Sequence, residues 1–240
     1  MKRQSIIILH GWGLSGERFL PLAEELRARG YTAYVPDMPG FGASSVPKNS
    51  LTLADYANFL NIFIQKHDIR NPVLIGHSFG GRVSIKYNMM YPKIVRALIL
   101  TGTPGFTPVN RKKLLLFIFL AKVGGAFWSL PPFCLFREFV QKWYYYAVGA
   151  RDFYRAEGSM RQTFKNIVQE DLELAMKSVK IPCLLLWGGQ DTIVPISIAH
   201  KMAAIMGTST LITIPDFGHN VPYRNSARFA HLVAQFIHRI

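Results

Sequence analysis

Short apolar runs alternate along this chain with helix-length amphipathic stretches, and this alternation limits the fold more than any other feature. The expected strands cover residues 5–9, 32–35, 73–75, 97–100, 183–187 and 210–214. The expected helices cover residues 19–29, 53–67, 80–90, 196–206 and 226–238. The strand runs are apolar on both faces, as in parallel strands that lie between two layers of helices. The sequence therefore predicts a doubly wound α/β fold around one mostly parallel sheet.

The alternation stops between residues 103 and 180, where no convincing strand occurs. Most connections in compact domains are only about 4–6 residues long, so we interpret 103–180 as an inserted helical cap. Residues 1–102 and 181–240 then form the core. The cap holds 15 of the 31 aromatic residues, which line a substrate cleft or form the cap's own core and its contact with the sheet.

One part of this insertion, residues 114–136, is nearly all apolar and contains a single charged residue, Lys122. Taken alone, such a stretch resembles a membrane span. Gly and Pro pairs at 124–125 and 131–132 interrupt it, and a span would separate the candidate site residues across a bilayer. Docking of this stretch at a membrane interface is the alternative that remains.

The chain is strongly basic, with 28 Lys and Arg against 14 Asp and Glu and a formal net charge of +14. Such a charge attracts anions, for example an acidic carrier protein or an anionic membrane surface. It equally fits a generally basic proteome or a high-salt cytoplasm, and nucleic-acid binding has no support beyond the charge. The isolated Cys134 and Cys183 lie in apolar runs, and the apolar stretch after Met1 is too short for a signal peptide, so we expect a cytoplasmic protein.

The most specific motif is GHSFG at residues 76–80, which fits the pattern G-x-S-x-G between an expected strand and an expected helix. This context predicts a nucleophile elbow, a turn so tight that only glycine fits two residues before and two after the serine. The turn presents the Ser78 hydroxyl and directs the first free N–H groups of the helix towards its target. The alternative is an ordinary strand-to-helix turn with a capping serine.

A serine hydroxyl needs a general base, and that base needs an orienting partner. Two later loops supply them, GGQDTIVP at 188–195 and PDFGHNVP at 215–222. Both follow expected strands, where open α/β sheets place their sites. We predict His219 as the base and Asp191 as its partner, with Asp216 as the rival acid. The remaining histidines fit helix surfaces or loop structure: His10, His67, His77, His200, His231 and His238.

The loop HGWG at residues 10–13 is the candidate oxyanion hole. Its two glycines let a backbone N–H point inward, so we expect the N–H groups of Trp12 and Phe79 to hold a developing oxyanion. The Trp12 ring is also expected to pack as an aromatic side chain. The two roles are compatible.

Together these motifs resemble the α/β-hydrolase family, through the sequences HGWG, DMPGFG at residues 37–42 and GHSFG with Asp191 and His219. The first two are particularly similar to esterases that remove methyl from pimeloyl-carrier-protein esters. The resemblance implies a structural role for Asp37. It also implies a sheet reduced to about six strands, because no residues remain for the family's usual first hairpin. No cofactor and no metal site is expected.

The resemblance and the motifs lead us to expect a serine hydrolase that cleaves small-molecule carboxylic esters with short to medium acyl or aryl groups. Trp128, Trp143 and Phe153 are the candidate substrate-binding residues. Two alternatives use the same residues differently. One is cleavage of a carbon–carbon bond or of a lactone, and the other is a ligand receptor or surface-binding protein with little turnover.

Overall fold

The computed structural model describes residues 3–106 and 156–240. Its centre is a sheet of six strands in the order β2-β1-β3-β4-β5-β6, and every neighbouring pair is parallel. The strands are β1 (Ser5–Leu9), β2 (Thr32–Tyr34), β3 (Val73–His77), β4 (Ala97–Thr101), β5 (Cys183–Gly188) and β6 (Ser209–Ile214). The predicted six-stranded, doubly wound sheet is therefore confirmed, and in the described residues it is fully parallel.

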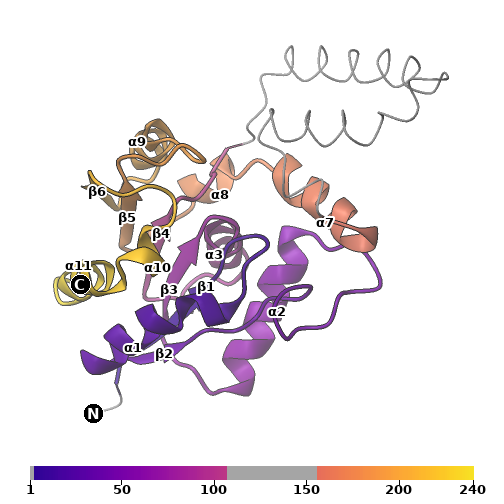
Figure 1. The fold of residues 1–240 in the computed structure, drawn as a ribbon, viewed down its shortest axis with the longest axis horizontal. Coiled ribbons are helices and arrows are strands. Elements are labelled where there is room, and N and C mark those ends of the chain that lie inside the picture. The colour runs from indigo at the N-terminus through magenta and orange to yellow at the C-terminus, as the bar shows by residue number, and fades with distance from the viewer. Residues whose placement is uncertain (1–2, 107–155) are drawn as a thin grey trace.

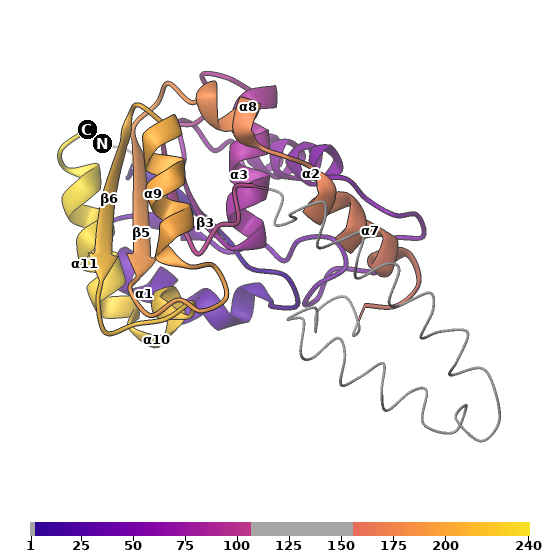
Figure 2. The ribbon, with the colours of Figure 1, turned by 90° about the horizontal axis from the view of Figure 1, so that it is seen from above.

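Helices cover both faces of this sheet (Figures 1 and 2). They are the 3₁₀ helix η1 (Gly16–Phe19), α1 (Leu20–Ala28), α2 (Leu53–Lys66), α3 (Phe79–Met90), α7 (Gly158–Gln169), α8 (Glu173–Lys177), α9 (Ile196–Ile205), α10 (Val221–Arg224) and α11 (Ser226–Ile237). Figure 2 shows α9 and α11 on opposite sides of β5 and β6. Each strand-to-strand connection in the core thus returns over one face or the other.

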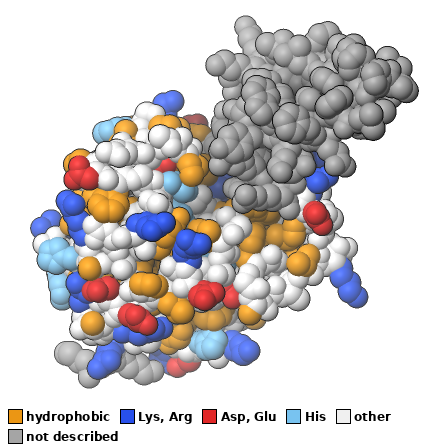
Figure 3. Space-filling model, viewed as in Figure 1, with side chains coloured by type: hydrophobic (Ala, Val, Ile, Leu, Met, Phe, Trp, Pro, Cys, Tyr) orange, Lys and Arg blue, Asp and Glu red, His pale blue; other side chains and the backbone are white. Residues whose placement is uncertain are grey.

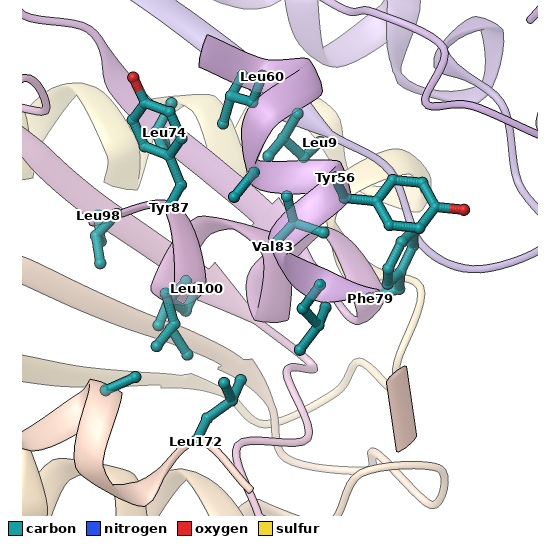
Figure 4. Close-up of a cluster of buried hydrophobic side chains, with 14 of the residues drawn as sticks. Leu9, Tyr56, Leu60, Leu74, Phe79, Val83, Tyr87, Leu98, Leu100 and Leu172 are labelled. Carbon is teal, nitrogen blue, oxygen red and sulfur yellow. The ribbon is translucent and has the colours of Figure 1, made fainter. Parts of the chain in front are cut away.

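Side chains of successive strand residues enter two separate hydrophobic clusters. Ile7 and Leu9 of β1 join the cluster formed with α2, α3, α8 and α9. Ile6 and Ile8 join the cluster formed with α1 and α11. Because side chains alternate between the faces of a strand, an apolar residue at every position fills both layers. Figure 4 shows the first cluster, with Val83 of α3 among leucines from three strands.

The expectation that all six strands are buried on both faces is wrong for the edge strands. The four inner strands are buried almost throughout, whereas β6 exposes Thr210 and Thr213 and β2 is only half-buried. Each edge strand has a neighbour on one side only. Its outer side chains therefore meet solvent.

The direction in which successive strands are added to the sheet reverses between β1 and β3. From β1 the chain winds outward to β2, and from there it crosses to β3 on the other side of β1. In open α/β sheets the carboxyl ends of the strands at such a switch point are the usual ligand position. The loop with Trp12 follows β1, and Ser78 follows β3.

Only the two ends of the expected cap, residues 103–106 and 156–180, are among the described residues. They include α7, and α8 with its buried Met176. Residues 114–136, Cys134, Trp128, Trp143 and Phe153 lie outside the described residues, while Cys183 is buried in β5. In the ranges that the structure describes, no helix is long and apolar enough to cross a membrane.

Candidate active site

Ser78 occupies a sharp turn between β3 and α3. Its backbone has φ 52° and ψ −112°, a left-handed value of φ that is unusual for a residue with a side chain. A Cβ on Gly76 would come within 2.4 Å of the Gly81 α-carbon, and one on Gly80 within 2.2 Å of the Leu9 carbonyl oxygen. Neither approach is possible, so both flanking positions require glycine.

Ser78 itself is half-buried, while the residues on either side of it are buried. Its N–H donates to the carbonyl oxygen of Thr101 at 2.9 Å, which fixes the turn against the end of β4. A strained residue that the surrounding structure holds in place is typical of functional sites. The geometry is that of the predicted nucleophile elbow.

His219 and Asp191 meet at the same edge of the sheet, from the loops that follow β6 and β5. The distance from Nδ1 of His219 to Oδ2 of Asp191 is 2.8 Å. The other oxygen, Oδ1, accepts the N–H groups of Ile193 at 2.9 Å and Val194 at 2.8 Å. Both carboxylate oxygens are thus satisfied by donors. The rival acid, Asp216, is exposed.

The side chain of Asp191 is only 1% exposed, against 14% for His219. A buried carboxylate that accepts three hydrogen bonds is held in one orientation. When Nδ1 of His219 donates to Oδ2 of Asp191, Nε2 is the acceptor nitrogen of the neutral ring. The arrangement therefore holds one imidazole tautomer with its acceptor nitrogen free.

The ring of His219 lies against the elbow. Its centroid is 4.7 Å from that of His77, the residue before Ser78. Gly102, which follows β4, also lies next to this ring, because a Cβ there would be 2.6 Å from Cε1 of His219. The structure therefore brings the three predicted residues, Ser78, Asp191 and His219, to one rim of the sheet.

Gly102 has a role in the site that the sequence motifs did not reveal. Its neighbour Thr101 accepts the hydrogen bond from Ser78, and its own backbone lies against the imidazole of His219. Gly102 is the first residue after β4, the strand that pairs directly with β3 and its elbow. The sequence signal for this role was a glycine immediately after a buried parallel strand. That signal is weak, because many glycines in this position only allow the chain to turn.

The predicted oxyanion loop lies beside the elbow. Gly13 has φ 68°, which favours glycine, and a Cβ on Gly11 would make a tight contact of 3.1 Å with Cδ2 of His77. Among the described residues, neither the Trp12 nor the Phe79 backbone N–H has a hydrogen-bond acceptor. Two unpaired donors next to a nucleophile are the arrangement that stabilises an oxyanion.

Aromatic side chains line this part of the site. The Trp12 ring makes edge contacts with Phe41, Phe79 and Phe164, at centroid distances of 4.9, 5.5 and 5.0 Å. Tyr56 packs edge-on against Phe79 at 4.9 Å, as Figure 4 shows from the side of α3. The predicted packing of Trp12 is therefore observed, and its ring belongs to an apolar wall next to the candidate oxyanion loop.

Two buried histidines, His10 and His77, lie beside the site. His10 donates from Nδ1 to the carbonyl oxygen of Gly11 at 2.9 Å, and its Nε2 accepts the N–H of Met38 at 3.0 Å. Burial lowers the pKa of His10, and burial followed by the nearby His219 lowers the pKa of His77 well below its ordinary value. Both rings are therefore neutral. They shape their loops, as the sequence predicted.

Asp37 has the structural position that the family resemblance implied. Its Oδ1 accepts the N–H of Gly16 at 2.6 Å, and its Oδ2 accepts the N–H of Ala43 at 2.9 Å. A Cβ on Gly42 would collide with this carboxylate at 2.2 Å. Asp37 thus ties the loop before α1 to the loop after β2, and both of its oxygens are occupied.

Arg82 of α3, one turn after Ser78, contacts both described ends of the expected cap. It is 2% exposed, and its guanidinium donates to the carbonyl oxygens of Pro104, Glu170 and Ile167, the last at 2.8 Å. Lys86 adds an ion pair with Glu170 at 2.8 Å. Burial lowers the pKa of Arg82 to about 10, so it stays protonated at neutral pH. The helix that follows the candidate nucleophile therefore also holds residues 104 and 167–170.

Comparisons with known proteins show which family has this fold. The family described as alpha/beta hydrolase fold matches residues 4–123. Lipase 1 of Psychrobacter immobilis is 26% identical over 231 residues, which cover 90% of this chain and 71% of that lipase.

Solved structures show the same fold. An esterase from Exiguobacterium antarcticum has a TM-score of 0.74 at 22% identity, covering 98% of this chain and 91% of its own. A meta-cleavage product hydrolase from Pseudomonas fluorescens has a TM-score of 0.72 at 20% identity, covering 99% of this chain and 92% of its own. Since the family match spans half of its residues, this chain belongs to the α/β-hydrolase fold family.

Proposed function

We propose that this protein is a serine hydrolase that cleaves carboxylic esters through an acyl-enzyme. The observation that carries the proposal is the 2.8 Å hydrogen bond between His219 and Asp191, placed against an elbow that holds Ser78 at φ 52°. A nucleophile, a base and an orienting acid at one strand edge are the parts that nucleophilic catalysis requires. The named activities of the lipase and esterase relatives point the same way.

In the first half of the reaction, Oγ of Ser78 attacks the ester carbonyl carbon while its proton passes to Nε2 of His219. The resulting oxyanion accepts hydrogen bonds from the N–H groups of Trp12 and Phe79. One such donor typically accelerates the reaction by about 10²–10³-fold. Collapse of this intermediate breaks the bond to the alcohol, which leaves with the proton from His219.

In the second half, water attacks the acyl-enzyme and gives its proton to His219. Collapse then releases the acid and restores the hydroxyl of Ser78. Asp191 keeps its negative charge throughout, and it stabilises the imidazolium that forms in each half. Its 1% exposure keeps water from competing for that hydrogen bond.

The substrate class that we propose is esters with a short to medium acyl group or an aryl group. Trp12, Phe41 and Phe164 form an apolar wall beside the candidate oxyanion loop, and such a wall suits a hydrocarbon or a ring. Trp128, Trp143 and Phe153 remain candidates for further contacts with this group, as part of a cap at residues 103–180. The finer likeness to pimeloyl-carrier-protein methyl ester esterases also remains a proposal.

A fluorophosphonate probe tests the nucleophile. It should label Ser78, and labelling should disappear in Ser78→Ala but persist in Ser50→Ala, a control at an exposed serine. Mass spectrometry of the labelled peptide identifies the site. A label on any other residue would contradict the proposal.

Turnover of p-nitrophenyl butyrate tests the base. His219→Ala should lower kcat by about 10³-fold or more with little change in KM, because the base acts mainly in the transition state. Parallel assays with ring-fission products and lactones test the two alternative reactions, cleavage of a carbon–carbon bond and cleavage of a lactone. Ligand-induced stabilisation without repeated turnover of any substrate would indicate a receptor instead.

A further inference from the structure

A second hollow lies at the same edge of the sheet, outside the elbow and its partners. It has a volume of about 500 Å³ and lies between η1 and α10. The residues that line it are Ser15, Glu17, Arg18, Pro21, Tyr223 and Arg224. We refer to it as the η1–α10 groove.

The two helices that form the groove directly follow loops of the candidate active site in the chain. η1 begins three residues after Gly13 of the oxyanion loop, and α10 begins two residues after His219. The Tyr223 ring is 5.8 Å from the ring of His77, which is in turn 4.7 Å from that of His219. The groove is therefore a neighbour of the site, linked to it by two ring contacts.

The polar groups of the groove converge on Tyr223. The guanidinium of Arg18 lies over the Tyr223 ring, 5.4 Å from its centroid, a cation–π contact that fixes the arginine in place. Burial raises the pKa of the Tyr223 hydroxyl, and the charges of Arg18 and Arg224 oppose this rise. Both arginines of the lining therefore lie near Tyr223.

The positive charge in the groove is not neutralised. Within residues 3–106 and 156–240, neither Arg18 nor Arg224 forms an ion pair. Glu17 is the single acid of the lining, so the groove carries one excess positive charge. On the face drawn in Figure 3, basic side chains are spread among acidic, apolar and polar ones.

We propose that the η1–α10 groove binds a small oxyanion, a carboxylate or a phosphate group, between the guanidinium groups of Arg18 and Arg224. Arginine binds such oxyanions through paired N–H donors, and the Tyr223 hydroxyl adds a third donor. Glu17 limits the charge that the groove accepts, because it repels a polyanion. This site goes beyond the proposed esterase function, and its binding test needs no turnover.

Calorimetric titration with inorganic phosphate at constant ionic strength tests the site. The unaltered protein should bind one phosphate saturably. Arg18→Gln combined with Arg224→Gln should weaken the association constant by at least about tenfold, as expected when charge-assisted hydrogen bonds are lost. Tyr223→Phe, which keeps the ring contacts, should weaken it by a few-fold.

A matched control separates the groove from the overall charge of the protein. Arg228→Gln combined with Arg239→Gln removes the same two charges from exposed positions in and after α11. This variant should bind phosphate within about twofold of the unaltered protein. Equal weakening in both double variants, or no saturable binding by the unaltered protein, would overturn the proposal.

A kinetic arm identifies the source of the anion. Its substrates are a p-nitrophenyl ester with a terminal carboxylate on the acyl chain and a neutral ester of equal length. If the anion is the far end of the substrate, the Arg18 and Arg224 double variant raises KM for the charged ester alone. If KM changes for neither ester although phosphate binding is lost, the groove serves a separate ligand.

Discussion

Gly102 offers the sharpest test of how the base is positioned. A Cβ added there would lie 2.6 Å from Cε1 and 2.7 Å from Nδ1 of His219, and 3.4 Å from Oδ2 of Asp191. Ordinary contacts begin at 3.4 Å, so the imidazole must move by about 0.8 Å to admit a methyl group. This movement displaces the ring from its 2.8 Å hydrogen bond with Asp191.

The expected loss of activity in Gly102→Ala follows from this displacement. A misplacement of about 1 Å in a catalytic group costs about 10²-fold in rate, so kcat for p-nitrophenyl butyrate should fall by about 10²-fold. KM should change little, because the ester binds against other groups. The φ of 55° also strains an alanine, which adds about 1–2 kcal/mol of destabilisation.

Gly30→Ala is the matched control for that strain. Gly30 has φ 89°, and a Cβ there meets nothing within 4 Å. This variant should lose a similar amount of stability in urea denaturation and keep its kcat. If Gly102→Ala keeps kcat within about threefold while its stability falls as in Gly30→Ala, the ring is not held as we infer.

Three further predictions concern the supports of the site. Arg82→Met should lower the free energy of unfolding by about 3 kcal/mol in urea denaturation, because three buried or partly buried carbonyl groups lose their donor; Lys86→Met, the control that removes only an ion pair, should lower it by less than about 1 kcal/mol. Asp37→Ala should cost about 2 kcal/mol in the same assay through its two lost hydrogen bonds, and an unchanged stability would contradict its structural role. Burial lowers the pKa values of His10 and His77, so below about pH 6.5 the unfolded chain binds protons that the folded chain does not. The free energy of unfolding should therefore fall with decreasing pH below that value, by up to about 1.4 kcal/mol per pH unit for each histidine. A flat profile from pH 7.5 to 5.5 would refute this.

The strands were predictable because burial on both faces leaves a continuous apolar run in the sequence. β1 has the predicted bounds, and β3 and β4 continue for one or two residues beyond them. The last residues of these two strands, His77 and Thr101, are polar, so hydropathy alone ends the strands too early. Edge exposure was not predictable, because strand order depends on contacts between distant segments.

The candidate triad was predictable for a different reason. Parallel strands bring their carboxyl ends to one edge, so loops far apart in sequence converge there. This rule places Ser78, Asp191 and His219 together without any knowledge of distances. It says nothing of Arg82, whose partners come from segments without a recognisable motif, because a lone arginine in an amphipathic helix is normally exposed.

The position of His219 depends on the core of the sheet as much as on its own loop. One face of its ring meets His77 from β3, its edge meets Gly102 after β4, and its Nδ1 meets Asp191 after β5. Three neighbouring strands thus fix one imidazole, and each contact is too close to relax independently. Because these strands are buried almost throughout, motion of the ring requires motion of the core. Substitutions outside the core should therefore have a larger effect on ester selectivity than on the position of the His219 ring.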